Sequence, residues 1–91
     1  MQVPVIIPSL LADCVGGTRE VVVQADRLDE AIAEIQRTFP LLRPHIWDDI
    51  GQLRQHVLIF HNDTATKWLE SLQVALQPGD RITFVQAVSG G

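Results

Sequence analysis

One stretch of this sequence has a clear helical repeat, and strand-like segments lie on both sides of it. Between residues 27 and 39, apolar side chains recur every three or four positions, which places them on one face of a helix. This face consists of Leu28, Ala31, Ile32, Ile35 and Phe39. Asp26 has the chemistry of an N-cap, and Pro40 ends the helix at the preceding residue. A chain with one such helix has one apolar helix face to bury, and a single sheet is the predicted partner.

Two strand-like segments precede the predicted helix. The first covers residues 1–7 and ends at Pro8, which removes the next backbone donor. Pro4 is unusual inside a strand because it lacks the N–H group that a ladder needs. After a pair of glycines, residues 18–24 are rich in β-branched side chains. The two segments are predicted to pair as a hairpin with a long loop.

The chain after the helix begins with a loop and returns to a strand. Residues 41–53 show no clear periodicity and predict a loop with one short helical turn. Trp47 is expected to hold this loop to the core. The segment HVLIFHND, residues 56–63, predicts a strand that finishes in a turn at its Asn-Asp pair.

The last third of the chain predicts a turn followed by a final strand. Residues 64–76 are mixed in character and predict a short strand or a turn. Pro-Gly-Asp at residues 78–80 is typical of a turn, and it precedes a strand over residues 81–88. One helix between two pairs of strands predicts a two-layer α+β sandwich. If the first and last strands lie side by side, they are parallel neighbours in its centre.

Length and composition restrict the function as well as the fold. At 91 residues, with 46% apolar and 20% charged side chains, the sequence predicts one folded domain over residues 1–91. The formal net charge of −4 opposes attraction to nucleic acid or to anionic lipid. No apolar stretch approaches the ~18 residues of a membrane span, and no basic segment of a signal peptide precedes the first strand. We therefore expect a cytoplasmic protein that binds neither nucleic acid nor membrane.

The side chains with catalytic or metal-binding chemistry form no recognisable motif. A metal hypothesis would use His45, His56, His61 and Cys14. Their spacings match no short zinc pattern, and His56 and His61 would face opposite sides of a strand, so no metal site is predicted. A single Cys14 agrees with a reducing compartment and with a small buried side chain rather than a nucleophile. The adjacent Asp48 and Asp49 are typical of solvated loop carboxylates, and no enzyme is predicted.

The sequence ends in Gly90-Gly91, directly after the last predicted strand. Two glycines at a chosen pair of positions occur by chance in roughly 0.5% of proteins. Since glycine has no Cβ, such a tail fits a narrow channel and brings its carboxylate to a reactive centre. A carboxylate becomes an acyl donor only when joined to a good leaving group, and ATP supplies one by forming an acyl-adenylate. The tail therefore predicts a partner enzyme that binds both the tail and ATP, whereas a pure binding module would carry the glycines incidentally.

The whole chain resembles the MoaD/ThiS class of small sulfur-carrier proteins, which are ubiquitin-like. The resemblance rests on the opening strand, the helix after the second strand, IFHND before a turn, and above all LQPGDRITFVQAVSGG. The loop before HVLIFHND and the opening IIPSLL most resemble the CysO type. This resemblance implies an α+β fold of the β-grasp type, with a mixed sheet of four to five strands packed on one main helix. It also implies a flexible tail over about residues 87–91.

The resemblance implies a function as well. In this class an E1-like adenylyltransferase of the MoeB/ThiF type uses ATP to adenylate the terminal carboxylate, which becomes a thiocarboxylate. The thiocarboxylate donates sulfur to a synthase of a cysteine, cofactor or secondary-metabolite pathway, and a sulfurtransferase is a further partner. By position, Gly91 would carry the sulfur, and Gly90 and Ser89 would thread the active sites, with no cofactor bound. Gln86 and Ser89 depart from the more apolar tail expected. A ubiquitin-like modifier joined to lysines through Gly91 is the alternative function.

The last strands also predict a surface for these partners. HVLIF carries apolar side chains on both of its faces, so either loops cover the second face or the face is a docking patch. By resemblance to β-grasp proteins, Ile82 and Phe84 face the helix, and their neighbours face outward. The predicted partner surface consists of Leu58, Phe60, Val85, Ala87 and Val88.

Overall fold

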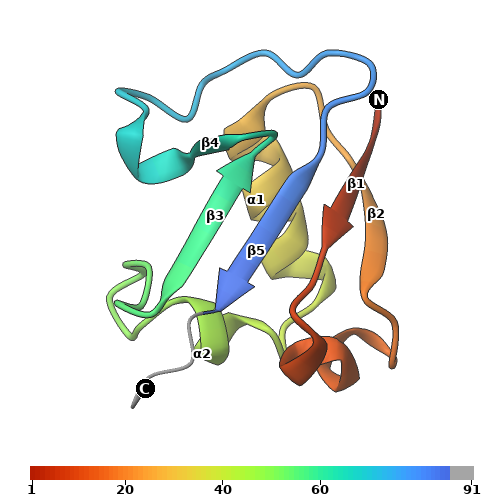
Figure 1. The fold of residues 1–91 in the computed structure, drawn as a ribbon, viewed down its shortest axis with the longest axis vertical. Helices are drawn as coiled ribbons and strands as arrows, with labels where there is room; N and C mark the ends of the chain where they lie inside the picture. The colour runs from red at the N-terminus through yellow and green to blue at the C-terminus, as the bar shows by residue number, and fades with distance from the viewer. Residues whose placement is uncertain (87–91) are drawn as a thin grey trace.

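The computed structural model describes residues 1–86 of the chain. In this part, one mixed sheet of five strands packs against one main helix, α1 (Leu28–Thr38) (Figure 1). The strands are β1 (Gln2–Ile6), β2 (Glu20–Gln24), β3 (Val57–His61), β4 (Thr64–Ala65) and β5 (Ile82–Gln86). The predicted two-layer α+β sandwich, with the element order of a β-grasp domain, is confirmed.

The first and last strands lie side by side in the sheet and run parallel, which is the direction expected for that arrangement. The strand order is β2-β1-β5-β3-β4, with β1 parallel to β5 and every other neighbouring pair antiparallel. Because β1 and β5 run in the same direction, they finish at the same end of the sheet. The 3-10 helix η1 (Ser9–Val15) and the short helix α2 (Arg43–Ile46) lie at this end (Figure 1). We call it the tail end, since Gln86 is the last described residue of β5.

Pro4 lies inside a central strand, although proline lacks the backbone N–H that a strand ladder uses. The Ala25 N–H donates to the Met1 carbonyl at 3.0 Å, so the odd-numbered residues of β1 exchange hydrogen bonds with β2. The nitrogen of Pro4 therefore faces β5. The paired register with β5 begins one residue later, at Val5 opposite Ile82. The missing N–H thus lies just before the parallel ladder starts, and it removes no bond from the pairing with β2.

The core forms between α1 and the inner face of the sheet. Its buried side chains include Val3, Val5, Ile7, Leu28, Ala31, Ile35, Val57, Ile59, Ile82 and Phe84. The predicted apolar face of α1 is therefore confirmed, with Ile32 and Phe39 half-buried at its margin. Trp47 is buried and its ring meets that of Phe84 edge-on, with centroids 6.0 Å apart and planes at 84°. This contact holds the loop after α1 to the core, as expected.

The cap of α1 differs from the prediction. Arg27, not Asp26, occupies the N-cap position, and Glu30 Oε1 accepts hydrogen bonds from the N–H groups of both Asp26 and Arg27 at 3.2 Å. The carboxylate of Asp26 instead lies 3.0 Å from the Met1 amino group. A glutamate one turn into the helix reaches back to these donors. The predicted Asp26 cap is therefore wrong, because a contact with the start of β1 engages this carboxylate.

Several elements differ from the predicted ones. The expected strand over residues 81–88 is observed as Ile82–Gln86, and residues 87 and 88 lie outside the described part of the chain. The long hairpin loop contains the 3-10 helix η1, which was not predicted, whereas α2 is the expected helical turn. A further 3-10 helix, η2 (Thr66–Trp68), follows β4. None of the helices within residues 1–86 is long and apolar enough to cross a membrane.

Candidate functional site

The predicted reactive tail lies outside the described residues, and β5 leads to it. The residues concerned are Ala87, Val88, Ser89, Gly90 and Gly91. β5 pairs with β3 along its whole length and with β1 at Ile82 and Thr83, so the strand that leads to the tail is held in the sheet. The side-chain Oε1 of Gln86 is buried and accepts no hydrogen bond from the described residues. The sheet thus supplies a fixed base for the tail, and at that base lies an acceptor that no residue within 1–86 satisfies.

Three residues of the predicted partner surface come together on the outer face of the sheet, the face turned away from α1. Leu58 and Val85 are directly opposite each other in the antiparallel β3–β5 ladder, so their side chains share a face. Phe60, opposite Thr83, lies on the same face. Val85 is 41% exposed, and Leu58 and Phe60 are half-buried. No helix within residues 1–86 covers this face, as Figure 1 shows with the strands in front of α1.

The outer face also carries apolar residues that the sequence analysis did not single out. Ile6 is paired with Thr83 of β5, and Pro4 is paired with Val22, whose side chain is 52% exposed. The apolar strip therefore continues from β3 to the edge strand β2. The signal that could have identified them is the alternation of the first strand, in which Val3 and Val5 have the opposite parity to Pro4 and Ile6. Outside the strands, Trp68 in η2 is an exposed aromatic side chain, and the Lys67 ammonium lies 5.2 Å from its ring centre.

A hydrogen-bonded cluster fixes the start of β5, at the opposite end from the tail. His61 Nε2 lies 2.8 Å from Asp80 Oδ2, and the Asn62 amide donates to Asp80 Oδ1 at 3.0 Å. The backbone N–H of Gln77 donates to Asp80 Oδ2, and that of Arg81 donates to Asn62 Oδ1. The hydrogen bonds from the Asn62 amide, the Gln77 N–H and His61, in this order of size, lower the pKa of Asp80 to about 2. The cluster is structural, since it ties the Pro-Gly-Asp turn to the end of β3.

Replacing Asp80 with asparagine is expected to lower the free energy of unfolding by about 1–2 kcal/mol at pH 7. The amide keeps the size of the side chain but presents an NH2 group to neighbouring donors. Because the pKa of Asp80 falls from 3.8 to about 2 on folding, its stabilisation is present above pH 4 and is lost as the pH falls towards 2. Urea unfolding at several pH values measures both effects.

The difference between the wild type and Asp80→Asn should therefore shrink on acidification from pH 4 to pH 2. Asp63→Asn is the matched control, because Asp63 is 97% exposed and its ion pair with Arg81 spans 3.4 Å. Exposed pairs of this kind contribute little to stability. An equal loss in both variants, or a loss for Asp80→Asn that does not vary with pH, would contradict the assigned role.

The residues of the metal hypothesis do not converge. His61 belongs to the cluster with Asp80, whereas His56 lies before the other end of β3 and His45 lies in α2. Cys14 is half-buried against the core. Among residues 1–86, no group of three or more His, Cys, Asp or Glu side chains is placed to hold a metal ion.

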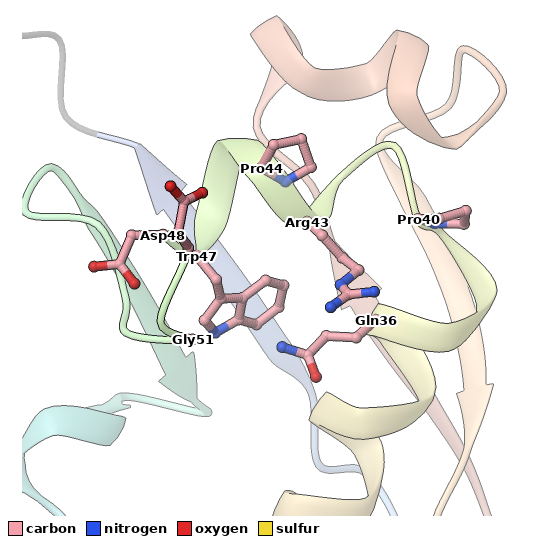
Figure 2. Close-up of a pocket in the computed structure, with 8 residues that line it drawn as sticks. Gln36, Pro40, Arg43, Pro44, Trp47, Asp48 and Gly51 are labelled. Carbon is pink, nitrogen blue, oxygen red and sulfur yellow. The ribbon is translucent and has the colours of Figure 1, made fainter.

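A pocket of about 530 Å³ opens beside α2, at the tail end of the sheet (Figure 2). Figure 2 shows Arg43 and Gln36 on one side of Trp47 and Asp48 on the other. The Asp48 carboxylate accepts the backbone N–H groups of Ile50 at 3.0 Å and Gln52 at 2.9 Å. This carboxylate thus shapes the loop that forms the pocket wall, which is a structural role.

Known proteins are similar to this chain in both sequence and architecture. The sequence model of the ThiS family matches residues 5–91. Sulfur carrier protein CysO of Mycobacterium tuberculosis (strain ATCC 25618 / H37Rv) is 30% identical over 93 residues, with all of both chains covered.

Solved structures agree with the family match. SAMP1 from Haloferax volcanii has a TM-score of 0.78 and 26% identity, with 100% of both chains covered. A chain of the Amycolatopsis orientalis BexX/CysO complex has a TM-score of 0.80 over 98% of this chain and 99% of its own. At 24% identity, the latter likeness concerns the fold alone. The family match and the full-length relative show that this β-grasp chain belongs to the ThiS family.

Proposed function

We propose that this protein is a sulfur carrier and that the Gly91 carboxylate is the group that receives the sulfur. One observation carries the proposal: the ThiS family match extends through Gly91. It is supported by a relative of the same span that is named a sulfur carrier protein. The described residues add a fixed base for the tail and an apolar outer face beside that base.

The proposed loading takes two steps. A carboxylate oxygen of Gly91 attacks the α-phosphorus of ATP, which forms the acyl-adenylate and releases pyrophosphate. A sulfide sulfur then attacks the acyl carbon, AMP leaves with the electrons of the C–O bond, and a thiocarboxylate remains. If a sulfurtransferase delivers the sulfur as a persulfide, a thiol reductant cleaves the S–S bond to release the same product. An E1-like adenylyltransferase of the MoeB/ThiF type supplies the ATP site, so the carrier itself needs neither cofactor nor catalytic residues.

We further propose that the partner enzymes bind the outer face next to the tail. Leu58, Phe60 and Val85 present apolar surface there, and Ala87 and Val88 follow directly in the sequence. Exposed apolar patches commonly mark interaction sites. The Amycolatopsis structure is a complex of BexX and CysO, which is consistent with a fold that binds other proteins. The sulfur-accepting synthase and the adenylyltransferase would both bind this face and the tail.

A protein modifier is the second candidate, and a specific observation favours it. The structural neighbour SAMP1 is a small archaeal modifier protein. A modifier begins with the same adenylation of Gly91 and diverges at the second nucleophile. A lysine amine, rather than sulfide, then takes the acyl group and forms an isopeptide bond.

Intact-mass measurement separates these functions. The chain is incubated with its adenylyltransferase, ATP and sulfide, with and without lysine-bearing acceptor proteins. A carrier gains mass equal to the exchange of one oxygen for one sulfur at its C-terminus. A modifier appears instead in larger covalent adducts. If neither product forms although the enzyme loads another carrier of the ThiS family in the same reaction, both candidates are overturned.

A further inference from the structure

The free side of the edge strand β2 can be identified from its ladder with β1. The Met1–Ala25 pair exchanges hydrogen bonds in both directions, at 3.0 and 3.3 Å. In an antiparallel ladder, bonded pairs alternate with pairs that are not bonded. The odd-numbered residues of β2 therefore direct their backbone groups to β1, and the N–H and C=O groups of Val22 and Gln24 point away from the sheet.

These outward groups form a template for another strand. Those of Glu20, the third outward-facing residue, bond to the Thr18 hydroxyl at 3.2 and 3.1 Å. Those of Val22 and Gln24 have no backbone partner within residues 1–86. Unpaired groups along a sheet edge pair readily with an extended chain. The exposed side chain of Val22 offers an apolar contact at the middle of this edge.

A groove of about 550 Å³ lies between the end of β2 and α1. It is lined by Met1, Gln24, Ala25, Asp26, Glu30, Ala33 and Glu34. A strand added to β2 would direct alternate side chains to the helix side of the sheet, where three carboxylates lie. Each of these carboxylates already has a partner. Asp26 pairs with the Met1 amino group, Glu30 with Arg27 at 3.7 Å, and Glu34 with Arg37. Pairs with exposed members are weak, so a ligand's cation can replace or share them.

We propose that the β2 edge and this groove bind an extended, basic peptide segment of another protein, by strand addition. Its alternate residues would be apolar on the outer side, beside Val22, and lysine or arginine on the helix side, facing Glu30 and Glu34. This site lies two strands away from Val85 in the sheet. It goes beyond the proposed sulfur-carrier function and depends on neither the tail nor adenylation.

The negative charge of the groove favours a basic segment over a second copy of this chain as its ligand. Two copies joined through β2 would bring two acidic grooves towards each other, in a chain whose formal net charge is −4. Like charges placed against each other in an interface are unfavourable. A lysine-bearing strand satisfies the same backbone groups and also neutralises the groove.

An NMR titration of the full-length, isotope-labelled protein tests the proposal. The probe is a short synthetic peptide with blocked ends in which valine alternates with lysine. Saturable shifts are expected for the amides of Val22 and Gln24 and along α1 at Glu30 and Glu34. Amide exchange at Val22 and Gln24 should slow. A peptide of alternating valine and glutamate is the matched probe and is expected to bind at least about tenfold more weakly.

Two pairs of variants separate strand addition from nonspecific attraction. Val22→Pro removes one outward donor but no bond to β1, and should weaken binding about tenfold, whereas Val22→Thr should bind like the wild type. Ala33→Lys adds a cation inside the groove and should weaken binding similarly, whereas Gln52→Lys adds one at an exposed position far from it.

Three outcomes would overturn the proposal. The first is equal binding by Val22→Pro and Val22→Thr when both are folded. The second is equal binding of the lysine and glutamate peptides. The third is a set of concentration-dependent shifts at β2 without any peptide, which would assign this edge to a second copy of the chain.

Discussion

Adding one alanine after Gly91 is expected to abolish sulfur loading while leaving the fold unchanged. The extension moves the carboxylate one residue further along the tail and replaces a terminal glycine by a residue with a Cβ. If a narrow tunnel of the adenylyltransferase positions the carboxylate at the α-phosphorus of ATP, this displacement separates the reacting atoms, and misplacement of this size costs orders of magnitude in rate. Intact mass after incubation with the enzyme, ATP and sulfide measures the loss.

Ser89→Ala is the matched control for this extension, because alanine is no larger than the serine expected to thread the active sites and the terminal Gly90-Gly91 is kept. It should load at close to the normal rate. The mass spectrum must also show that no protease has removed the added alanine. An intact extended chain that is loaded normally would refute the assignment of Gly91 as the sulfur-bearing residue. Deletion of Gly90-Gly91 without any loss of function would instead favour a binding module.

The two layers of this fold were predictable because the helix and the strands follow from local patterns. The apolar positions Leu28, Ala31 and Ile35 recur at helical spacing, and all three are buried. The Pro-Gly-Asp turn marked the start of β5 to within two residues. The alternation along β5 placed Phe84 and Val85 on opposite faces, and the resemblance to β-grasp proteins predicted that Phe84 faces α1. The outer-face part of the candidate site followed from the same alternation.

Features that depend on contacts between distant segments could not be predicted in this way. Asp26 and Glu30 are both chemically suitable caps for α1, and the Met1 amino group, which engages Asp26, settles the choice. The bonds from His61 and Asn62 to Asp80 join two turns, and neither turn alone indicates them. The free edge of β2 likewise depends on the hydrogen-bond parity of its ladder with β1.

The variant Val85→Asp places a charge on the outer face and is expected to weaken binding of the adenylyltransferase by about ten- to a hundredfold. The side chain lies opposite Leu58 and beside Phe60 on the face proposed to meet the enzyme. A carboxylate there must lose its water when an apolar surface closes over it, and its burial without a partner is costly. Losses of about 1.4–2.7 kcal/mol at an interface residue correspond to this range of affinity. Titration calorimetry against the enzyme measures the change.

Val22→Asp is the matched control, since it places the same charge on the same face, at another exposed valine two strands away. Both substitutions put aspartate into a strand, so their effects on unfolding should be similar and can be compared by urea titration. Only Val85→Asp should weaken the complex if the enzyme contacts β3 and β5 beside the tail. Equal weakening by both variants would mean that the enzyme covers the whole outer face or responds to net charge. Unchanged affinity in Val85→Asp would show that the enzyme binds the tail without contacting this surface.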